Sequence, residues 1–260
     1  MHGFNDGIKT VADRLRVARR ITVMTGAGVS AASGVPTFRG PGGLWRSFRP
    51  EELATAEAFE RDPRLVWEWY DWRRGLIAKC EPNAAHEVLA RWSRRPEFTL
   101  ITQNVDGLHE RSLRLAPLAQ GKGADVIRFH GSIWRLKCWD ECGRQEWEDT
   151  TFPITPLPAR CPDCSGLARP AVVWFGESID PRVLHACDAA VACDVFLSIG
   201  TSSVVYPAAG LVHAARRRGA FTVEINPQAT EAASAVDIAI EAPAELALPQ
   251  LSTLLESAMG

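Results

Sequence analysis

A buried strand that runs directly into a glycine turn most constrains the fold of this 260-residue chain. Residues 21–24 are apolar or β-branched and predict the strand, and Gly26 and Gly28 then break the pattern before a short helix that 29–33 can begin. Glycines let a backbone approach a phosphate, and the free N–H groups of a helix N-terminus point at it. The stretch therefore predicts an anion site, with an ordinary tight turn as the alternative because G-x-G alone is a weak signal.

The segment after this turn predicts a loop over a bound cofactor. Thr37, Phe38 and Arg39 follow the short helix, and a glycine-rich run at 40–43 follows them. Arg39 offers a cation for phosphate, and Phe38 offers an apolar lid.

Strand and helix patterns alternate along most of the remaining chain. Further strands are expected at 98–102, 125–130, 171–175, 195–199, 221–225 and 238–240, and helices at 10–20, 84–92, 181–192, 207–218 and after Pro249. This alternation predicts an α/β fold with a Rossmann-like parallel sheet and helices on both faces. Helical patterns at 51–59 and from Pro63 to Ile77 interrupt the alternation and indicate a smaller inserted domain.

Four of the seven cysteines have the spacing of a zinc site. Cys138 and Cys142 form one pair and Cys161 and Cys164 the other, and thiolate pairs in tight turns suit tetrahedral Zn²⁺. Four protein ligands leave no open position, so the predicted zinc ribbon is structural; a redox pair or a degenerate site is the alternative. The other three cysteines are expected to be small buried apolar residues in a protein of a reduced compartment: Cys80, Cys187 and Cys193.

Polar residues follow several predicted strands, at the edge where an open α/β sheet binds its ligands. These groups are Gln103, Asn104 and Asp106, then His130, then Gly200, Thr201 and Ser202, and finally Asn226. The amides and the carboxylate of the first group can grip a planar polar ligand, although an Asx-rich turn is the simpler interpretation of them alone. A lone histidine is more often structural than a base, and ordinary turns explain the last two groups equally well.

The composition limits the classes of partner. A net charge of −2 does not indicate binding to nucleic acid or to an anionic membrane, and the predicted zinc ribbon is itself acidic. No apolar run approaches the ~20 residues of a membrane span, and the first ten residues lack the apolar core of a secretory signal. We therefore expect a cytoplasmic protein without nucleic-acid or membrane partners.

The sequence GAGVSAASGVPTFRG at 26–40 resembles the cofactor-binding segment of the sirtuins, the NAD-dependent protein deacylases. Four later segments agree with it in the family's order, and the resemblance extends from about Val11 to about Leu248. It implies an NAD-binding domain at 1–35, 84–130 and 171–260, and a small helical and zinc-binding domain at 36–83 and 131–170.

The resemblance also implies roles at the NAD site. Gln103 is expected at the nicotinamide ribose, Asn104 and Asp106 at the nicotinamide pocket, and His130, in the motif HGS, as the general base. Ala244, in the penultimate loop, corresponds to a backbone contact with adenine. The whole set implied for NAD is Gly26, Ala27, Gly28, Ser30, Thr37, Phe38, Arg39, Trp45, Gln103, Asn104, Asp106, Gly200, Thr201, Ser202, Asn226 and Ala244.

A further segment, VVWFGE at 172–177, resembles the one that pairs with a substrate peptide as an added strand. Main-chain hydrogen bonds hold an extended peptide without reading its sequence, which implies broad tolerance of acyl-lysine peptides. The residues implied for this contact are Val173, Trp174, Phe175, Gly176 and Glu177. A plain buried strand is the alternative.

The pair Tyr70 and Arg73 bears on the acyl group. On a helix, residues three apart share a face, and the pattern alone favours an amphipathic helix with Arg73 in solvent. However, Tyr-x-x-Arg at this place resembles the sirtuins that remove succinyl, malonyl or glutaryl groups. Arg can grip the terminal carboxylate of such a chain and Tyr can donate an O–H, while Ala54 leaves room and Thr37 also fits this subgroup.

The sequence thus predicts an NAD-dependent lysine deacylase that removes succinyl and malonyl groups, acetyl groups included, and yields nicotinamide and O-acyl-ADP-ribose. A monomer is expected. The alternatives are a plain deacetylase, a non-catalytic module that binds NAD or peptide, and an NAD-dependent dehydrogenase. The dehydrogenase is the weakest of these hypotheses, because no strand end precedes Glu51 and Glu52, the candidate ribose ligands.

Overall fold

The computed structural model describes residues 2–37, 43, 49–115 and 126–257. Its centre is a six-stranded sheet in the order β3-β2-β1-β7-β8-β9, in which every pair is parallel. The strands are β1 (Ile21–Thr25), β2 (Phe98–Thr102), β3 (Val126–Arg128), β7 (Val195–Ile199), β8 (Phe221–Asn226) and β9 (Ile238–Glu241). The predicted α/β fold is confirmed, and the strands predicted at 98–102 and 195–199 have their predicted bounds.

The direction in which strands are added reverses beside β1. After β1 the chain adds β2 and β3 on one side, and it later adds β7, β8 and β9 on the other. Every residue of β1 and β7 is buried, as expected for central strands that helices cover on both faces. Ligands of open α/β sheets bind outside the carboxyl ends of the strands at such a switch point.

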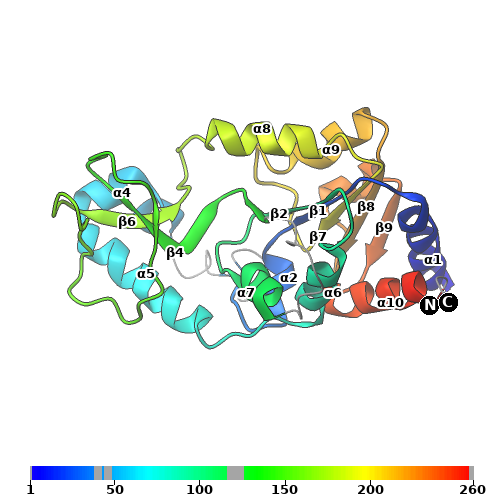
Figure 1. Ribbon diagram of the computed structural model, residues 1–260, viewed down its shortest axis with the longest axis horizontal. Coiled ribbons are helices and arrows are strands. Elements are labelled where there is room, and N and C mark those ends of the chain that lie inside the picture. The colour runs from blue at the N-terminus through cyan, green and yellow to red at the C-terminus, as the bar shows by residue number, and fades with distance from the viewer. Residues whose placement is uncertain (1, 38–42, 44–48, 116–125, 258–260) are drawn as a thin grey trace.

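Helices cover both faces of the sheet (Figure 1). On one side lie α1 (His2–Val17), α6 (Ala84–Trp92), α7 (Leu108–Leu115) and α10 (Ala244–Glu256), and on the other lie α8 (Pro181–Ala190) and α9 (Gly210–Arg217). The short α2 (Ala27–Ala31) follows β1, and a 3-10 helix, η2 (Glu231–Ala235), precedes β9. Each face has its own apolar core. Among the helices of the described residues, none combines the length and the hydropathy that a membrane span requires.

A smaller module extends from one end of the sheet (Figure 1). It contains α3 (Pro50–Leu53), α4 (Ala56–Arg61), α5 (Pro63–Ile77) and an antiparallel sheet in the order β5-β4-β6. The strands of this sheet are β4 (Gly131–Cys138), β5 (Trp147–Glu148) and β6 (Ala168–Val172). A third apolar core holds the module together around Phe59, Trp67 and Trp174.

Two predicted elements of the module were wrong in extent. The strand expected at 171–175 is β6, which begins at Ala168, ends at Val172 and pairs with β4 rather than with the large sheet. It ends there because the next residues turn, and Glu177 N–H donates to the Trp174 carbonyl at 3.1 Å. The helix expected at 51–59 is divided into α3 and α4 because the Thr55 hydroxyl caps α4, accepting from Ala58 N–H at 3.1 Å.

Both terminal helices also differ from their predicted bounds. The first was expected at 10–20 but ends at Val17, because the carboxylate of Asp194 accepts the next N–H groups, those of Arg19 and Arg20, at 2.8 and 2.9 Å. The last helix begins at Ala244 and includes Pro249, after which it was expected to start. Its buried side chains, Ala247, Leu248, Leu251 and Leu255 among them, form a continuous apolar face that outweighs the loss of one N–H donor.

Substitution of Gly131 by Ala should destabilise the junction between the sheet and the module. Gly131 has a φ of +79°, and a Cβ there would lie 2.1 Å from the carbonyl oxygen of Ala171 in the paired strand β6. Backbone strain and overpacking together should lower the free energy of unfolding by about 2–5 kcal/mol, measured by denaturant titration. Gly219→Ala is the matched control: its φ is +88° with nothing within 4 Å, so strain alone should cost about 1 kcal/mol. Equal losses in the two variants would contradict the predicted clash.

Candidate active site

A cavity of about 1050 Å³ lies at the switch point of the large sheet. Its walls come from the residues that follow β1, β2, β7 and β8, from α5 of the smaller module, and from the segment after β6. The polar groups predicted to follow these strands therefore meet at one place.

Two glycine turns cross at the floor of this cavity. Gly28 N–H donates to the carbonyl oxygen of Gly200 at 2.8 Å, and a Cβ on Gly28 would lie 2.8 Å from the Gly200 Cα. Gly200 has a φ of +61°, and a Cβ on Gly26 would lie 2.8 Å from Thr201. Glycine is therefore required on both turns because their backbones touch.

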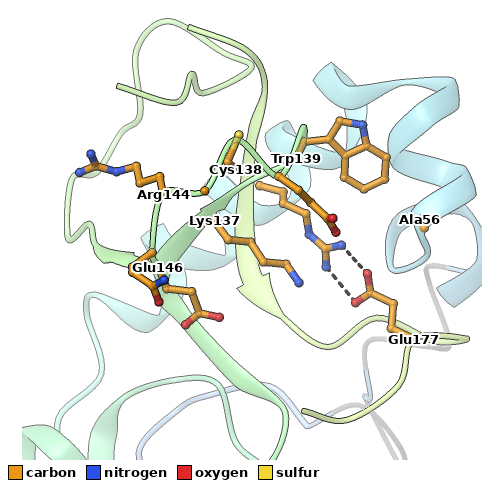
Figure 2. A pocket seen from close by; sticks show the side chains of 11 residues that line it. Ala56, Lys137, Cys138, Trp139, Arg144, Glu146 and Glu177 are labelled. Atoms are coloured by element: carbon orange, nitrogen blue, oxygen red, sulfur yellow. Dashed lines mark hydrogen bonds and ion pairs between the residues drawn. The ribbon is translucent and has the colours of Figure 1, made fainter. Parts of the chain in front are cut away.

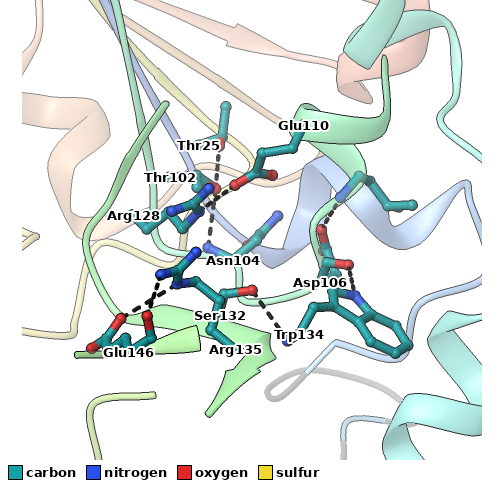
Figure 3. Close-up of polar contacts among 11 residues, drawn as sticks. Thr25, Thr102, Asn104, Asp106, Glu110, Arg128, Ser132, Trp134, Arg135 and Glu146 are labelled. Carbon is teal, nitrogen blue, oxygen red and sulfur yellow. Dashed lines mark hydrogen bonds and ion pairs between the residues drawn. The ribbon is translucent and has the colours of Figure 1, made fainter. Parts of the chain in front are cut away.

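Behind the cavity, a buried network orients Asn104 and Asp106. The Asn104 amide donates to the Gly26 carbonyl at 3.0 Å and to the Ser30 hydroxyl at 3.1 Å. Ser30 in turn donates to one oxygen of Asp106 at 2.8 Å, and Leu108 N–H donates to the other at 2.9 Å. Burial raises the pKa of the Asp106 carboxyl, whereas these two donors lower it. Figure 3 shows Asp106 beside Trp134, whose indole donates to the Asp106 carbonyl at 2.6 Å.

The structure brings most of the predicted cofactor residues to the cavity. Those that line it are Gly26, Ala27, Gly28, Thr37, Gln103, Asn104, Gly200, Thr201, Ser202 and Asn226. Ser30 and Asp106 are buried behind Asn104 and do not line it. Ala244, expected in a loop, is instead the buried first residue of α10 and is not among the residues that line this cavity, and its backbone contact with adenine stays a prediction. Phe38, Arg39 and Trp45 lie outside the described residues.

His130 is half-buried and lines the cavity. Its Nδ1 lies 3.2 Å from the carbonyl oxygen of Gln103. A carbonyl only accepts, so Nδ1 carries the proton and Nε2 holds a free lone pair. Burial lowers the pKa of the ring, partly offset by that hydrogen bond. His130 is therefore a neutral proton acceptor at physiological pH, fixed in one tautomer.

Tyr70 and Arg73 both line the cavity from α5, together with Ala54. They are only 2% and 5% exposed, so the alternative that places Arg73 in solvent is wrong. The Arg73 guanidinium lies 4.9 Å from the centroid of the Trp69 ring. Burial lowers its pKa while Tyr70 and Asp106 raise it, and burial raises the pKa of the Tyr70 phenol. The wall thus offers a cation beside a protonated hydroxyl.

The segment predicted to hold a peptide, 173–177, lines the same cavity. Phe175 N–H donates to the Ala54 carbonyl at 2.9 Å, so part of its main chain is already paired inside the protein. The carboxylate of Glu177 is bound by the guanidinium of Arg169. Glu177 therefore stabilises the segment 173–177 through its contacts with Arg169 inside the protein.

Several residues of the cavity were missed from the sequence. Leu184, Val205 and Tyr206 line it, as does the run 228–231 after Asn226. Tyr206 is 72% exposed. A polar run directly after a strand end was a usable signal for 228–231, whereas nothing local identifies the apolar side chains.

A second buried network lies behind Asn104 and includes His109. The Nε2 of His109 lies 2.9 Å from the Thr25 hydroxyl. That hydroxyl donates to the Thr102 hydroxyl at 2.9 Å, and Figure 3 shows the two threonines. The Thr102 hydroxyl also accepts from Asn104 N–H at 3.0 Å. Burial lowers the pKa of His109 to about 4, and burial and the adjacent His109 lower that of His86 to about 2. Both rings are neutral in the folded protein near pH 7.

The four predicted zinc ligands converge at the end of β4. Their Sγ atoms all lie within 4.8 Å of one another, and the contacts Cys138–Cys164 and Cys142–Cys161 are 3.6 and 3.7 Å. A zinc tetrahedron with bonds of about 2.3 Å has edges of about 3.8 Å, so the donors fit Zn²⁺. Cys80, Cys187 and Cys193 are buried, as predicted.

Sequence and fold comparisons point to one family. The model of the Sir2 family matches residues 26–207. Over 242 residues the chain is 47% identical to an NAD-dependent protein deacylase of Aquifex aeolicus, covering 92% of this chain and 97% of the relative. A Sir2 homologue solved in complex with NAD has a TM-score of 0.86 at 38% identity, over 97% of this chain and 95% of that one. A mutant Sir2 homologue in complex with 2'-O-acetyl ADP ribose gives the same TM-score and identity.

Removal of zinc should unfold the module. The four cysteines close the loop between β4 and β6, and structural zinc contributes directly to folding free energy. One zinc per chain is expected by elemental analysis, and Cys161→Ser should lose most of it and lower the melting temperature. Cys187→Ser, a buried cysteine of the large domain, should keep the metal. Equal zinc content in both variants would contradict the assignment.

Protonation of His109 should destabilise the fold at acid pH. The unfolded ring takes up a proton below about pH 6.5, whereas the folded ring resists until about pH 4. Between these values the unfolded state binds more protons, so the free energy of unfolding falls as the pH falls, by about 1.4 kcal/mol per unit for this group. His109→Gln keeps a donor towards Thr25 and removes the titration, so its stability curve, followed by denaturant titration, should be flatter than wild type in this window. Parallel curves would show that His109 does not contribute.

Proposed function

Because the chain belongs to the Sir2 family and is an NAD-dependent protein deacylase, we propose that it acts on lysine side chains carrying acidic acyl groups, succinyl and malonyl, as well as acetyl. One observation carries the proposal: a buried arginine and a buried tyrosine form one wall of the cavity that also holds His130. A buried guanidinium that lines a cavity favours an anionic group in the ligand, because a carboxylate can pair with it there.

The cavity suits NAD as the cosubstrate. Its volume of about 1050 Å³ and its position at the switch point are those of a dinucleotide site, and Gly28 and Gly200, whose side chains take up no space, line it. Thr201, Ser202 and Asn226 are proposed to hold the adenosine side, and Asn104 and Gln103 the nicotinamide side, with Ser30 and Asp106 acting through Asn104. Bound NAD would supply an anomeric carbon that takes up the acyl oxygen as nicotinamide leaves. With one water consumed as the C–N bond of the amide breaks, the products would be lysine, nicotinamide and O-acyl-ADP-ribose.

His130 is proposed as the general base. The Gln103 carbonyl fixes the proton on Nδ1, so the free Nε2 can accept a proton from a ribose hydroxyl. Its lowered pKa keeps the ring neutral into mildly acidic solution. Activity should therefore decline only as the pH falls below the ordinary histidine range.

The acyl end of the substrate is proposed to lie against α5. Arg73 can bind a terminal carboxylate through two N–H groups, and Tyr70 can donate its O–H to the same group. Ala54, 6% exposed and small, leaves room for a chain longer than acetyl. The segment 173–176 is proposed to hold the peptide backbone, which would leave the selection to the acyl group.

Removal of the Arg73 charge should change the acyl preference. In Arg73→Met, kcat/KM for a succinyl-lysine peptide should fall about 30-fold or more, because a buried carboxylate loses its charge partner. The effect on the matching acetyl-lysine peptide should be much smaller. Mass spectrometry of both peptides, with and without NAD, measures the ratio.

Two controls make this experiment decisive. Arg64→Met removes an exposed arginine from the same helix and should leave the succinyl-to-acetyl ratio at the wild-type value. His130→Ala should lose turnover of both peptides. NAD-dependent removal of acetyl alone would reject the acidic preference and leave a plain deacetylase.

A further inference from the structure

The indole of Trp174 lies between Tyr70 and the buried guanidinium of Arg169, which pairs with the half-buried Glu177. Trp174 is 2% exposed, and its Nε1–H donates to the Tyr70 hydroxyl oxygen at 2.8 Å. On the other side, the guanidinium carbon of Arg169 lies 3.2 Å from the centroid of a Trp174 ring. Trp174 thus contacts both Tyr70, on the cavity wall that Tyr70 forms with Arg73, and the guanidinium of Arg169.

The ion pair between Arg169 and Glu177 holds the Trp174 indole in place. Arg169 is 2% exposed and donates to both carboxylate oxygens of Glu177 and to the Val172 carbonyl, the last at 2.8 Å. Glu177 in turn accepts from the backbone N–H of Trp174 at 2.8 Å. Figure 2 shows the two contacts to Glu177, which lines both the main cavity and a second one of about 560 Å³ beside Cys138. The pair therefore fixes both the backbone and the ring of Trp174.

The direction of the Trp174–Tyr70 hydrogen bond determines where the tyrosine proton goes. An indole N–H can only donate, so the Tyr70 oxygen is the acceptor in this bond. The single phenol proton is then left for another partner, and among the described residues no acceptor for it is found within hydrogen-bond distance. Because Tyr70 lines the cavity beside Arg73, a ligand bound there can supply the acceptor.

We propose that Trp174 is a specificity-determining positioning residue, which fixes the Tyr70 hydroxyl as a donor towards a carboxylate at the end of the acyl chain. The inference rests on the proposed preference for acidic acyl groups. An acetyl group ends in a methyl and has no acceptor at that position, so the orientation of the Tyr70 proton matters only for succinyl and malonyl chains. Arg169 and Glu177 act through Trp174, by keeping the indole in place.

Two substitutions and their combination test this role. Trp174→Phe keeps an aromatic ring over Arg169 and removes the N–H, and Tyr70→Phe removes the hydroxyl. Each should lower the succinyl-to-acetyl ratio of kcat/KM about tenfold, the value of one hydrogen bond of about 1.4 kcal/mol. The loss should lie mainly in KM for the succinyl peptide, because the carboxylate contact is made before the chemical step.

The double variant separates positioning from mere packing. If Trp174 acts through Tyr70, adding Trp174→Phe to Tyr70→Phe should not lower the ratio further. Additive losses in the ratio, or equal losses for both peptides in Trp174→Phe, would overturn the proposal. Trp72→Phe, an exposed tryptophan on the same helix as Tyr70, is the matched control and should keep the wild-type ratio.

A second variant keeps the test decisive if Trp174→Phe does not fold. Glu177→Gln retains the shape of the side chain and removes the charge that keeps Arg169 against the indole. As a single substitution it should lower the succinyl-to-acetyl ratio of kcat/KM about threefold. Added to Tyr70→Phe, it should not lower the ratio further. A succinyl-to-acetyl ratio unchanged by Glu177→Gln would overturn the role proposed for Arg169 and Glu177. A wild-type enzyme without Arg73-dependent succinyl removal would instead overturn the proposed function, and this inference with it.

Discussion

The contact between the turns that follow β1 and β7 is the constraint on which the site depends. Gly28 and Gly200 meet with their backbones 2.8 Å apart from donor nitrogen to acceptor oxygen, and any side chain on either would push the turns apart. This contact sets the position of Asn104, which donates to the Gly26 carbonyl, and hence of Ser30 and Asp106 behind it. A close backbone crossing at the switch point thus positions a polar network built from strand ends.

The smaller module contributes buried charges, each held by specific partners. Arg74 donates to the Ile133 carbonyl and pairs with Asp149, joining α5 to β4. Arg169 pairs with Glu177 inside the turn after β6. Isolated ions would be costly in such places, so each buried guanidinium requires the carboxylate that this packing supplies. That arrangement delivers α5, with the residues proposed to bind the acyl group, to the edge of the large sheet.

Much of the large domain could be predicted because its signals are local. Buried strands such as 98–102 and 195–199 are short apolar runs, and their bounds were found correctly. The errors lie where a contact distant in sequence decides the outcome. Helix α1 ends where Asp194 captures the next N–H groups, and the strand β6 was misplaced because it pairs with β4 of the module. A propensity pattern contains no information about either partner.

The sequence alone determined the strand-and-glycine turn, the four cysteine ligands and the residues brought to strand ends, because chain spacing fixes each of these. Only the tertiary structure decided that Arg73 is buried rather than solvated, and that Ser30 and Asp106 stand behind Asn104 instead of facing the cavity. It alone joined Trp174 to Tyr70, 104 residues apart. The reason is physical: helix periodicity defines which residues share a face, but what that face meets depends on how α5 packs against the turn after β6.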